Sequence, residues 1–436
     1  MTARRQEAAW VLTEAAAEPY FNLVQRYVFA PYFAATLAAN PGQGASVWGL
    51  ALGSAGLAIA LLAPVIGAIA DSGSRLRNWL AGFAFLSVVA AGALWFAVPG
   101  APLWPVAVVV ALGIFAVELL GMFVNAFLPR VAPGHRVGAL SAVGFGLSQV
   151  AGLAALLFVF TASGLAPRLF PDIPFATDRL AGPIAAVFIL ACIIPFLLLV
   201  REPPVARTAS ARAGLATLRA TLLEAWRDSN MRRFLIGRML AADGMAVVFG
   251  FGAVLAAASF GWDAGTMVVF GAIITVFGAV GGFFGGWLDP RLGSHRLMML
   301  GLITLLLGTT SVILTDETRL LGIPTGVALG EPLASPQELG FLASGAVVAL
   351  GAAFTLGAMR ACMARLAPAA AVAAYFGLYA FVGKATAFVG PFLVSAIAAA
   401  TGTVRLGIVV AVVFLVAGLA LLAGVRVGRE ARQIAG

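Results

Sequence analysis

The chain has 436 residues, of which 62% are hydrophobic and only 10% are charged, and its mean hydropathy is +1.03. A soluble globular domain carries roughly 25% charged residues, so this composition excludes a water-soluble fold. A formal charge of +9 would suggest nucleic-acid binding in a soluble protein. Here the basic residues lie in short loops between apolar segments, where they set membrane orientation, so we expect no nucleic-acid partner.

The apolar segments, taken in chain order, predict the fold. One membrane crossing needs about 20 apolar residues, so the chain has room for about twelve crossings and short loops. We predict an all-α membrane protein whose twelve transmembrane helices form two six-helix bundles related by pseudo-twofold symmetry. The segments lie at about 11–38, 46–70, 79–98, 104–128, 138–162, 183–200, 234–258, 264–288, 297–314, 339–359, 370–398 and 405–425.

The expected domains follow from this count: an N-terminal bundle over 1–200, a basic linker over 201–233, and a C-terminal bundle over 234–436 with a short tail. Within the linker, Leu215, Leu218, Leu222 and Trp226 recur at helical spacing with arginines between them. This pattern predicts an amphipathic helix on the cytoplasmic membrane surface. A solvated tether is the alternative interpretation.

Loop charges predict the orientation. If loops are assigned alternately to the two sides of the membrane, nearly all arginines, including the linker cluster, lie on one side, which we take as cytoplasmic. Both termini then lie in the cytoplasm. The N-terminus carries acidic residues where a signal peptide would have its apolar core, so we expect no cleaved leader. The Arg-rich and Ala-rich composition favours a bacterial inner membrane.

Two similar motifs occupy corresponding loops of the two halves. The first runs from Gly67 through Asp71 to Arg75 and Arg77, and the second runs from Gly285 through Asp289 to Arg291 and Arg296. Asp71 and Asp289 are 218 residues apart, which is half of the 436-residue chain. A single copy would be a weak signal, but two copies at this spacing indicate a duplicated six-helix unit.

These two motifs resemble the signature loop of the major facilitator superfamily, a Gly-xxx-Asp-x-x-Gly-Arg/Lys pattern between helices 2 and 3 and between helices 8 and 9. The resemblance implies alternating-access transport in which the loops act as cytoplasmic gates. Each aspartate is expected to pair with an arginine of the same loop or of a neighbouring helix in one state and to lose it in the other. The expected gating residues are Asp71, Arg75, Arg77, Asp289, Arg291 and Arg296.

A narrower resemblance rests on two stretches. Arg238 to Gly244, in helix 7, and Tyr375 to Pro391, in helix 11, resemble the vacuole-effluxer-like branch of that superfamily, relatives of a fungal amino-acid effluxer. Helix 1 departs from that branch, because Glu14-Ala-Ala-Ala-Glu18-Pro19-Tyr20 stands where an Asp-Trp-Ala-Asn type of run is usual. The resemblance therefore implies efflux of a small solute without fixing which one.

Ionisable residues deep inside apolar helices are costly, about 2.5–3.5 kcal/mol each on insertion scales, and so indicate function. Four lie near the predicted midplane: Arg26, Glu118, Asp243 and Lys384. In helix 1, Glu14, Glu18, Asn22 and Arg26 recur every four residues and form one polar stripe. Other candidates for the same polar cavity are Gln25, Asn125, Gln149 and Tyr379.

We expect Arg26 and Lys384 to bind a carboxylate or phosphate of the substrate, and Glu118 or Asp243 to carry a coupling proton. The alternative is that Arg26–Glu118 and Asp243–Lys384 are two static ion pairs that fix helix packing. Buried pairs are seldom net stabilising relative to apolar packing, which favours a working site.

Several other functions were weighed. An intramembrane enzyme is disfavoured because the helices carry no HExxH, Gly-x-Ser-x-Gly or histidine, and we expect neither a cofactor nor a metal. A channel would repeat its pore residues by symmetry. We expect a monomeric transporter that contacts membrane lipids, protons and a small amphoteric or anionic solute such as an amino acid. A lysolipid flippase, a drug exporter and a sensor that keeps a transporter fold remain alternatives.

Overall fold

The computed structural model describes residues 3–39, 41–71, 76–132, 135–200, 211–262, 264–330, 333–369, 371–387, 389–401 and 403–427. In this part of the chain, ten helices are long and apolar enough to cross a membrane. They are α4 (Pro41–Asp71), α5 (Leu76–Ala93), α6 (Leu103–Val131), α7 (Val137–Leu169), α8 (Ala176–Leu199), α10 (Ser229–Phe260), α11 (Ala264–Leu292), α12 (Ser294–Leu314), α13 (Pro336–Leu366) and α16 (Val404–Ala423).

The other two predicted crossings, helix 1 and helix 11, are discontinuous. Helix 1 consists of short pieces, and helix 11 consists of two helices separated by turns at Gly383–Ala387, which we call the helix 11 break. Together with the ten continuous helices they fit the predicted twelve-helix fold. The pieces of helix 1 are α1 (Ala3–Glu14), α2 (Glu18–Tyr20), the π-helix η1 (Phe21–Tyr27), α3 (Phe29–Tyr32) and the π-helix η2 (Phe33–Leu37); those of helix 11 are α14 (Val372–Val382) and α15 (Val389–Thr401).

Proline and glycine account for these interruptions. Pro19 lies at the start of α2 and Pro31 lies inside α3, and proline has no N–H to donate to the preceding turn. In helix 11, Gly383 follows α14 and Pro391 lies in the first turn of α15, where a missing N–H is tolerated. The sequence therefore stops and restarts both helices inside an apolar segment.

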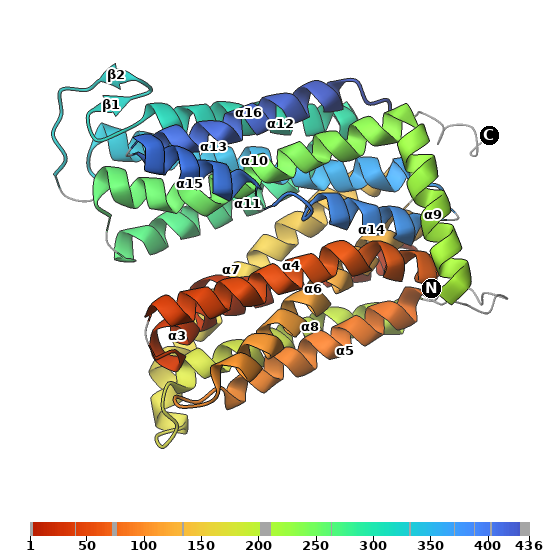
Figure 1. Ribbon diagram of the computed structural model, residues 1–436, viewed down its shortest axis with the longest axis horizontal. Coiled ribbons are helices and arrows are strands. Elements are labelled where there is room, and N and C mark those ends of the chain that lie inside the picture. Colours follow the sequence, from red (N-terminus) through yellow and green to blue (C-terminus); the bar gives the residue numbers. More distant parts are fainter. Residues whose placement is uncertain are drawn as a thin grey trace. The chain divides into compact units, whose positions relative to one another are not determined.

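The chain divides into two compact units. Unit 1 comprises Met1–Pro133, Leu147–Thr221 and Ala367–Phe381, and the remaining residues form unit 2. In unit 1, α5 packs on α6 and α8, and α1 packs on α8 (Figure 1). In unit 2, α12 packs on α13, α10 on α16, and α15 on both α10 and α16. The first turns of α7 thus belong to unit 2, and most of α14 belongs to unit 1.

The surfaces of the long helices are apolar. Large side chains such as Leu61, Phe85, Phe160 and Leu198 are exposed, each by more than half of its surface. Contiguous exposed apolar surface of this kind requires a nonpolar surrounding. The arrangement is that of an integral membrane protein.

Short elements connect the spans. The linker forms α9 (Ala211–Arg227), and two strands, β1 (Arg319–Leu320) and β2 (Ile323–Pro324), pair antiparallel after α12. On α9, Leu222 and Trp226 are exposed, as an amphipathic helix on a membrane surface requires. The side chains of Leu215 and Leu218 lie outside the described residues, so the surface location of the linker stays a prediction.

Candidate functional site

Three polar side chains of helix 1 contact one another within unit 1. Arg26 Nη1 donates to Glu18 Oε1 over 2.7 Å and to Asn22 Oδ1 over 2.8 Å. Asn22 is buried, but 48% of the Arg26 side chain is exposed. The three residues are spaced by four and follow one helix face. The stripe is thus an internally bonded cluster with an accessible cation.

The local backbone presents this cluster. Asn22, Gln25 and Arg26 all belong to the π-helix η1, which begins directly after Tyr20. π-Helical turns are rare and occur frequently at functional sites, because the inserted residue redirects the side chains around it. Gln25 is half-buried beside Arg26, and Glu14 is half-buried at the end of α1.

Helix α7 passes close to the cluster. A side chain at Gly152 would collide with the Asn22 amide and would lie 2.8 Å from Glu18 Cγ. Only glycine at this position lets α7 approach the polar stripe of helix 1. Gln149 lies one turn before Gly152 and is half-buried. The structure therefore brings α7 next to Glu18 and Asn22, and Gln149 lies within the same part of α7.

Helix α6 contributes the remaining candidates of unit 1. Glu118 is half-buried, and its charge acts on Arg26. Asn125 lies two turns further along α6, and its Oδ1 is buried with no hydrogen-bond partner among the described residues. The hydrogen-bonded carboxylate partner of Arg26 is Glu18 of its own helix.

Asp243 lies on α10 in unit 2. It is 2% exposed, and Thr386 Oγ1, from the helix 11 break, donates to its Oδ2 over 2.5 Å. Its Oδ1 is buried with no hydrogen-bond partner in the described part of the chain. The charge of Arg238, also on α10, acts on this carboxylate. Asp243 therefore joins α10 to the discontinuity of helix 11.

Lys384 and Tyr379 lie on either side of the end of α14. Lys384 is half-buried in the helix 11 break, two residues before Thr386. Its pairing with Asp243 stays a prediction. Tyr379 is buried in α14, where its ring packs edge-on against Phe376 with centroids 5.9 Å apart. Tyr379 thus fills the interior of unit 1 in this conformation.

The first gating aspartate caps a helix. Asp71, the last residue of α4, accepts a hydrogen bond of 2.6 Å from the backbone N–H of Ala374, in the first turn of α14. The charge of Arg130 also acts on Asp71. A carboxylate at a helix N-terminus satisfies free N–H groups and interacts favourably with the helix dipole. Arg75 lies outside the described residues.

The second gating aspartate has the corresponding position in unit 2. Asp289 Oδ1 accepts a hydrogen bond of 2.5 Å from Ser294 Oγ, and Oδ2 lies 3.6 Å from Arg365 Nη2. Its carboxylate abuts Gly138, in the first turn of α7, so closely that no side chain would fit there. Asp71 and Asp289 thus each contact the beginning of a helix from the other half of the sequence.

The gating arginines that are described point elsewhere. Arg77 donates to the carbonyl of Leu197, and the Arg291 guanidinium lies over the Trp287 ring at 3.9 Å. Arg296 is exposed. In this conformation the loops use these cations at helix ends and surfaces, and the cation nearest Asp289 comes from α13.

Four partners were missed at the sequence level: Arg238, Arg365, Ala374 and Thr386. Arg238 carried a detectable signal, since it lies inside an apolar segment five residues before Asp243. Arg365 was visible only as one of many loop arginines. A backbone N–H and a lone threonine carry no sequence signal, because their roles depend on which helices pack together.

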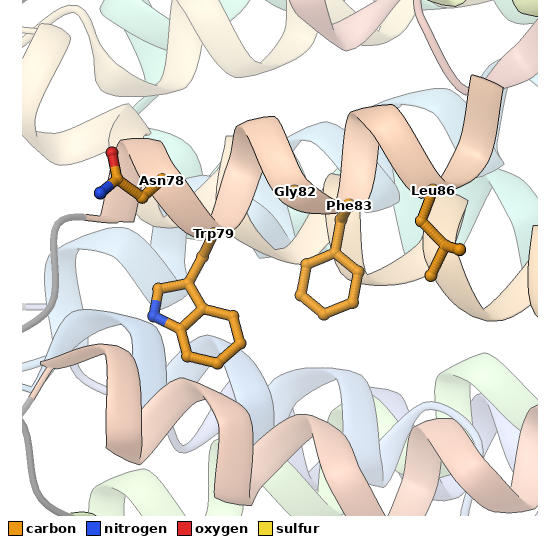
Figure 2. Close-up of a pocket in the computed structure, with 5 residues that line it drawn as sticks. All are labelled: Asn78, Trp79, Gly82, Phe83 and Leu86. Carbon is orange, nitrogen blue, oxygen red and sulfur yellow. The ribbon is translucent and has the colours of Figure 1, made fainter. Parts of the chain in front are cut away.

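A shallow groove lies on α5, lined by Asn78, Trp79, Gly82, Phe83 and Leu86 (Figure 2). Trp79 and Phe83 stack on each other and on Phe123 of α6, with centroids about 6 Å apart. The lining carries no charged residue and none of the candidates above. This groove is a feature of aromatic packing and does not extend the candidate site.

Comparison with known proteins identifies the family. A family model described as "Vacuole effluxer Atg22 like" matches residues 135–435, more than half of the chain. The chain belongs to this family. The vacuole effluxer-like proteins are major facilitator transporters, so the predicted superfamily and its narrower branch are both confirmed.

Individual relatives agree with the assignment. An uncharacterized MFS-type transporter of Bacillus subtilis (strain 168), YxiO, is 24% identical over 440 residues, covering 96% of this chain and 94% of the relative. The E. coli fucose:proton symporter FucP superposes with a TM-score of 0.70 at 14% identity, covering 97% of both chains. The human organic anion transporter MFSD10 gives 0.69 at 14% identity, covering 97% of this chain and 100% of that one. At these identities the structural matches show the fold alone, and this vacuole effluxer-like chain has the fold of a major facilitator transporter.

Proposed function

We propose that this chain is a secondary active transporter that works by alternating access, is coupled to protons and moves a small amphoteric or anionic solute such as an amino acid. The observation that carries the proposal is the pair of discontinuous helices with charged side chains at their interruptions. Arg26 bonds Glu18 and Asn22 at the break in helix 1, and Asp243 bonds Thr386 at the break in helix 11. Broken helices in transporters commonly line the substrate and ion sites.

The polar groups divide into two roles. Arg26 and Lys384 bind the anionic group of the solute, and Glu118 or Asp243 takes up and releases the coupling proton. Glu18, Asn22, Gln25, Asn125, Gln149 and Tyr379 line the path. Support comes from cost: each charge inside an apolar helix is unfavourable by about 2.5–3.5 kcal/mol on insertion scales, and packing alone would be served as well by leucine.

The gates are the contacts made by Asp71 and Asp289. Each caps or abuts the first turn of a helix from the other half of the sequence. Losing these contacts would free the N-termini of α14 and α7, which is the kind of two-state change that alternating access needs. Arg75, Arg77, Arg291 and Arg296 would then become partners in the other conformation.

We further propose that the chain is a monomer of the bacterial inner membrane with both termini in the cytoplasm. The support is the concentration of arginines in alternate loops and in the linker around α9. The E. coli relative in fold is a proton symporter and the human one an organic anion transporter, in keeping with proton coupling and an anionic cargo.

The test is solute counterflow in proteoliposomes. Thermal-shift screening of the purified protein with amino acids, peptides, organic anions and lysolipids would select ligands, because a ligand stabilises the state that binds it. Hits are then loaded inside the vesicles and the entry of labelled solute is followed with and without a pH gradient. We expect counterflow of an amino acid or organic anion that is lost in Arg26→Ala and in Lys384→Ala.

Each alternative gives a different result. A sensor would bind a hit without counterflow, and a flippase would move lysolipid between leaflets and ignore polar solutes. Counterflow of a polar solute that is unchanged in both Arg26→Ala and Lys384→Ala would contradict the proposed site. As a control, Arg296→Ala removes an exposed loop cation and should leave binding intact.

A further inference from the structure

The helix 11 break is held by two charged residues of α10. A Cβ atom at Gly383 would lie 2.8 Å from Arg238 Nη1 and 2.9 Å from its Nη2, so the guanidinium rests against the backbone at the start of the break. Thr386, at the other end of the break, donates to Asp243. Arg238 and Asp243 therefore contact the two ends of one non-helical segment.

Asp243 also lies against the beginning of α15. A Cβ atom at Gly390 would lie 3.4 Å from the Asp243 carbonyl oxygen and 2.6 Å from Val247, so the first turn of α15 passes directly over this part of α10. A helix N-terminus favours negative charge through its free N–H groups and its dipole. The end of the break is thus a local environment for an anion.

The charges around the break do not balance. Arg238 and Lys384 contribute two positive charges, and Asp243 contributes one negative charge. One oxygen of that carboxylate, Oδ1, is buried without a hydrogen-bond partner among the described residues. A second anionic group would neutralise the set, and two cations beside a helix N-terminus match the size and charge of a carboxylate.

The break is also accessible. Residues 372–379 of α14 are buried throughout, whereas residues 380–387 are half-buried. The backbone groups of the break and Lys384 are therefore open on one side, while Asp243 behind them is 2% exposed. A ligand reaching the break would meet Lys384 and the segment contacted by Arg238 before it meets Asp243.

We propose that Arg238 is an anion-binding residue of this transporter and that a substrate carboxylate binds Arg238 and Lys384 at the helix 11 break in exchange for Asp243. This inference rests on the proposed transport function and assigns a specific residue set and ligand group to it. As the substrate carboxylate arrives, Asp243 takes up one proton and becomes a neutral acid. Its hydrogen bond with Thr386 persists, because a threonine hydroxyl both donates and accepts.

The exchange balances atoms and charge. No covalent bond other than O–H forms or breaks: one proton moves from water to Asp243 as one carboxylate binds, and the reverse occurs on release. The site holds the same net charge with and without a monoanion. Each monoanion is therefore accompanied by one proton, so its transport is electroneutral, whereas a zwitterion would move with one net positive charge.

The experiment uses the single lysine of the chain. Reductive methylation with ¹³C-formaldehyde labels Lys384 and the N-terminal amine, and it keeps the positive charge. The Lys384 methyl resonance of protein in nanodiscs is then titrated with acetate, benzoate and L-leucine. L-leucinamide, which lacks the carboxylate, and chloride are the control probes.

We expect the three carboxylates to shift the Lys384 resonance and the control probes to leave it in place. Asp243→Asn should tighten carboxylate binding at neutral pH by about tenfold or more, since the competing carboxylate is gone, and should remove its pH dependence. Arg238→Gln should weaken it by a similar factor, with Arg238→Lys intermediate. Asp316→Asn, a matched loss of charge in a loop, should behave as wild type.

The proposal is overturned if Asp243→Asn responds to carboxylates no more than to leucinamide, or binds them more weakly than wild type does. A folded Arg238→Lys or Arg238→Gln variant with wild-type carboxylate affinity would also overturn it. Binding does not require transport, so a chain that binds carboxylates but fails in counterflow refutes the transport function and leaves this site standing. Counterflow without any Lys384 response does the opposite.

Discussion

Helix 1 and helix 11 are both interrupted within the membrane span, yet their charges are completed differently. In helix 1, Arg26 finds Glu18 and Asn22 on its own helix, and nearly half of its side chain stays exposed. In helix 11, the break contacts Arg238 and Asp243 of another helix, α10. The helix 1 cluster is local and open, whereas the helix 11 cluster is tertiary and partly enclosed.

This difference predicts different consequences of mutation. An ion pair within one exposed helix face contributes little to folding, so changes in helix 1 should affect substrate handling and leave stability nearly unchanged. A buried carboxylate that joins two helices is coupled to packing, so changes around Asp243 should alter both. Four measurements test the comparison, from the largest expected effect to the smallest.

The double variant Arg238→Ala/Lys384→Ala should show the largest loss. Two charge-assisted hydrogen bonds to the solute, each contributing about 1.5–3 kcal/mol, correspond to more than a hundredfold loss of counterflow rate. Lys384→Arg keeps the charge and should retain most of the rate. Counterflow in proteoliposomes measures this, and a double variant within threefold of wild type would remove the helix 11 cluster from the mechanism.

Arg26→Ala should lower counterflow by about tenfold or more, the loss of one charge-assisted bond. Its effect on the free energy of unfolding should be only about 0.5 kcal/mol, because the pair is exposed and lies within one helix. Thermal denaturation in detergent gives the second quantity, with Arg26→Lys as control. A variant that is destabilised but still transports at the wild-type rate would make the helix 1 cluster structural.

Asp71→Ala and Asp289→Ala should each shift the balance between conformations by about 1 kcal/mol, the usual contribution of a helix cap, or roughly fivefold in population. Asp71→Asn keeps an acceptor oxygen for the Ala374 N–H and should shift it less. Alkylation of cysteines introduced one at a time near Gly67 and Gly377 reports the change. Equal alkylation rates in wild type and Asp71→Ala would refute a gating role for the cap.

Asp316, in the loop after α12, should give the smallest effect. Burial acts to raise its pKa, but hydrogen bonds from the N–H and hydroxyl of Thr318 and from the N–H of Arg319, with the charge of Arg405, lower the pKa below its usual value. A lowered pKa stabilises the folded loop above the unfolded value of about 4, and this stability is lost as the pH falls through the folded value. Amide exchange at Thr318 should therefore accelerate only in acid, and in Asp316→Asn it should lose that dependence.

The fold was predictable from the sequence because it depends on local patterns. Apolar length fixed the twelve segments, and the Asp71 and Asp289 motifs marked the duplication. The polar stripe of helix 1 was visible because its residues contact one another along one helix. Pro19 likewise marked a local disturbance in that helix.

The remainder depends on tertiary structure. The segment 370–398 was predicted as one crossing, but it is two helices, since Gly383 and the Gly390-Pro391 pair interrupt it where α10 supplies contacts from outside. The partners of Asp71 and Asp243 are a backbone N–H and a threonine hydroxyl, neither of which carries a pattern. Arg238 was visible as a charge within an apolar segment, but its contact with Gly383 depends on how α10 meets helix 11.

The most direct test of a proton-coupled transporter separates exchange from driven transport. Proteoliposomes containing wild type, Glu118→Gln, Asp243→Asn or the double variant are assayed for counterflow and for uptake driven by a pH gradient. We predict that wild type performs both, and that loss of the coupling carboxylate abolishes driven uptake while counterflow persists. Driven uptake that is unaltered in all three variants would contradict the account.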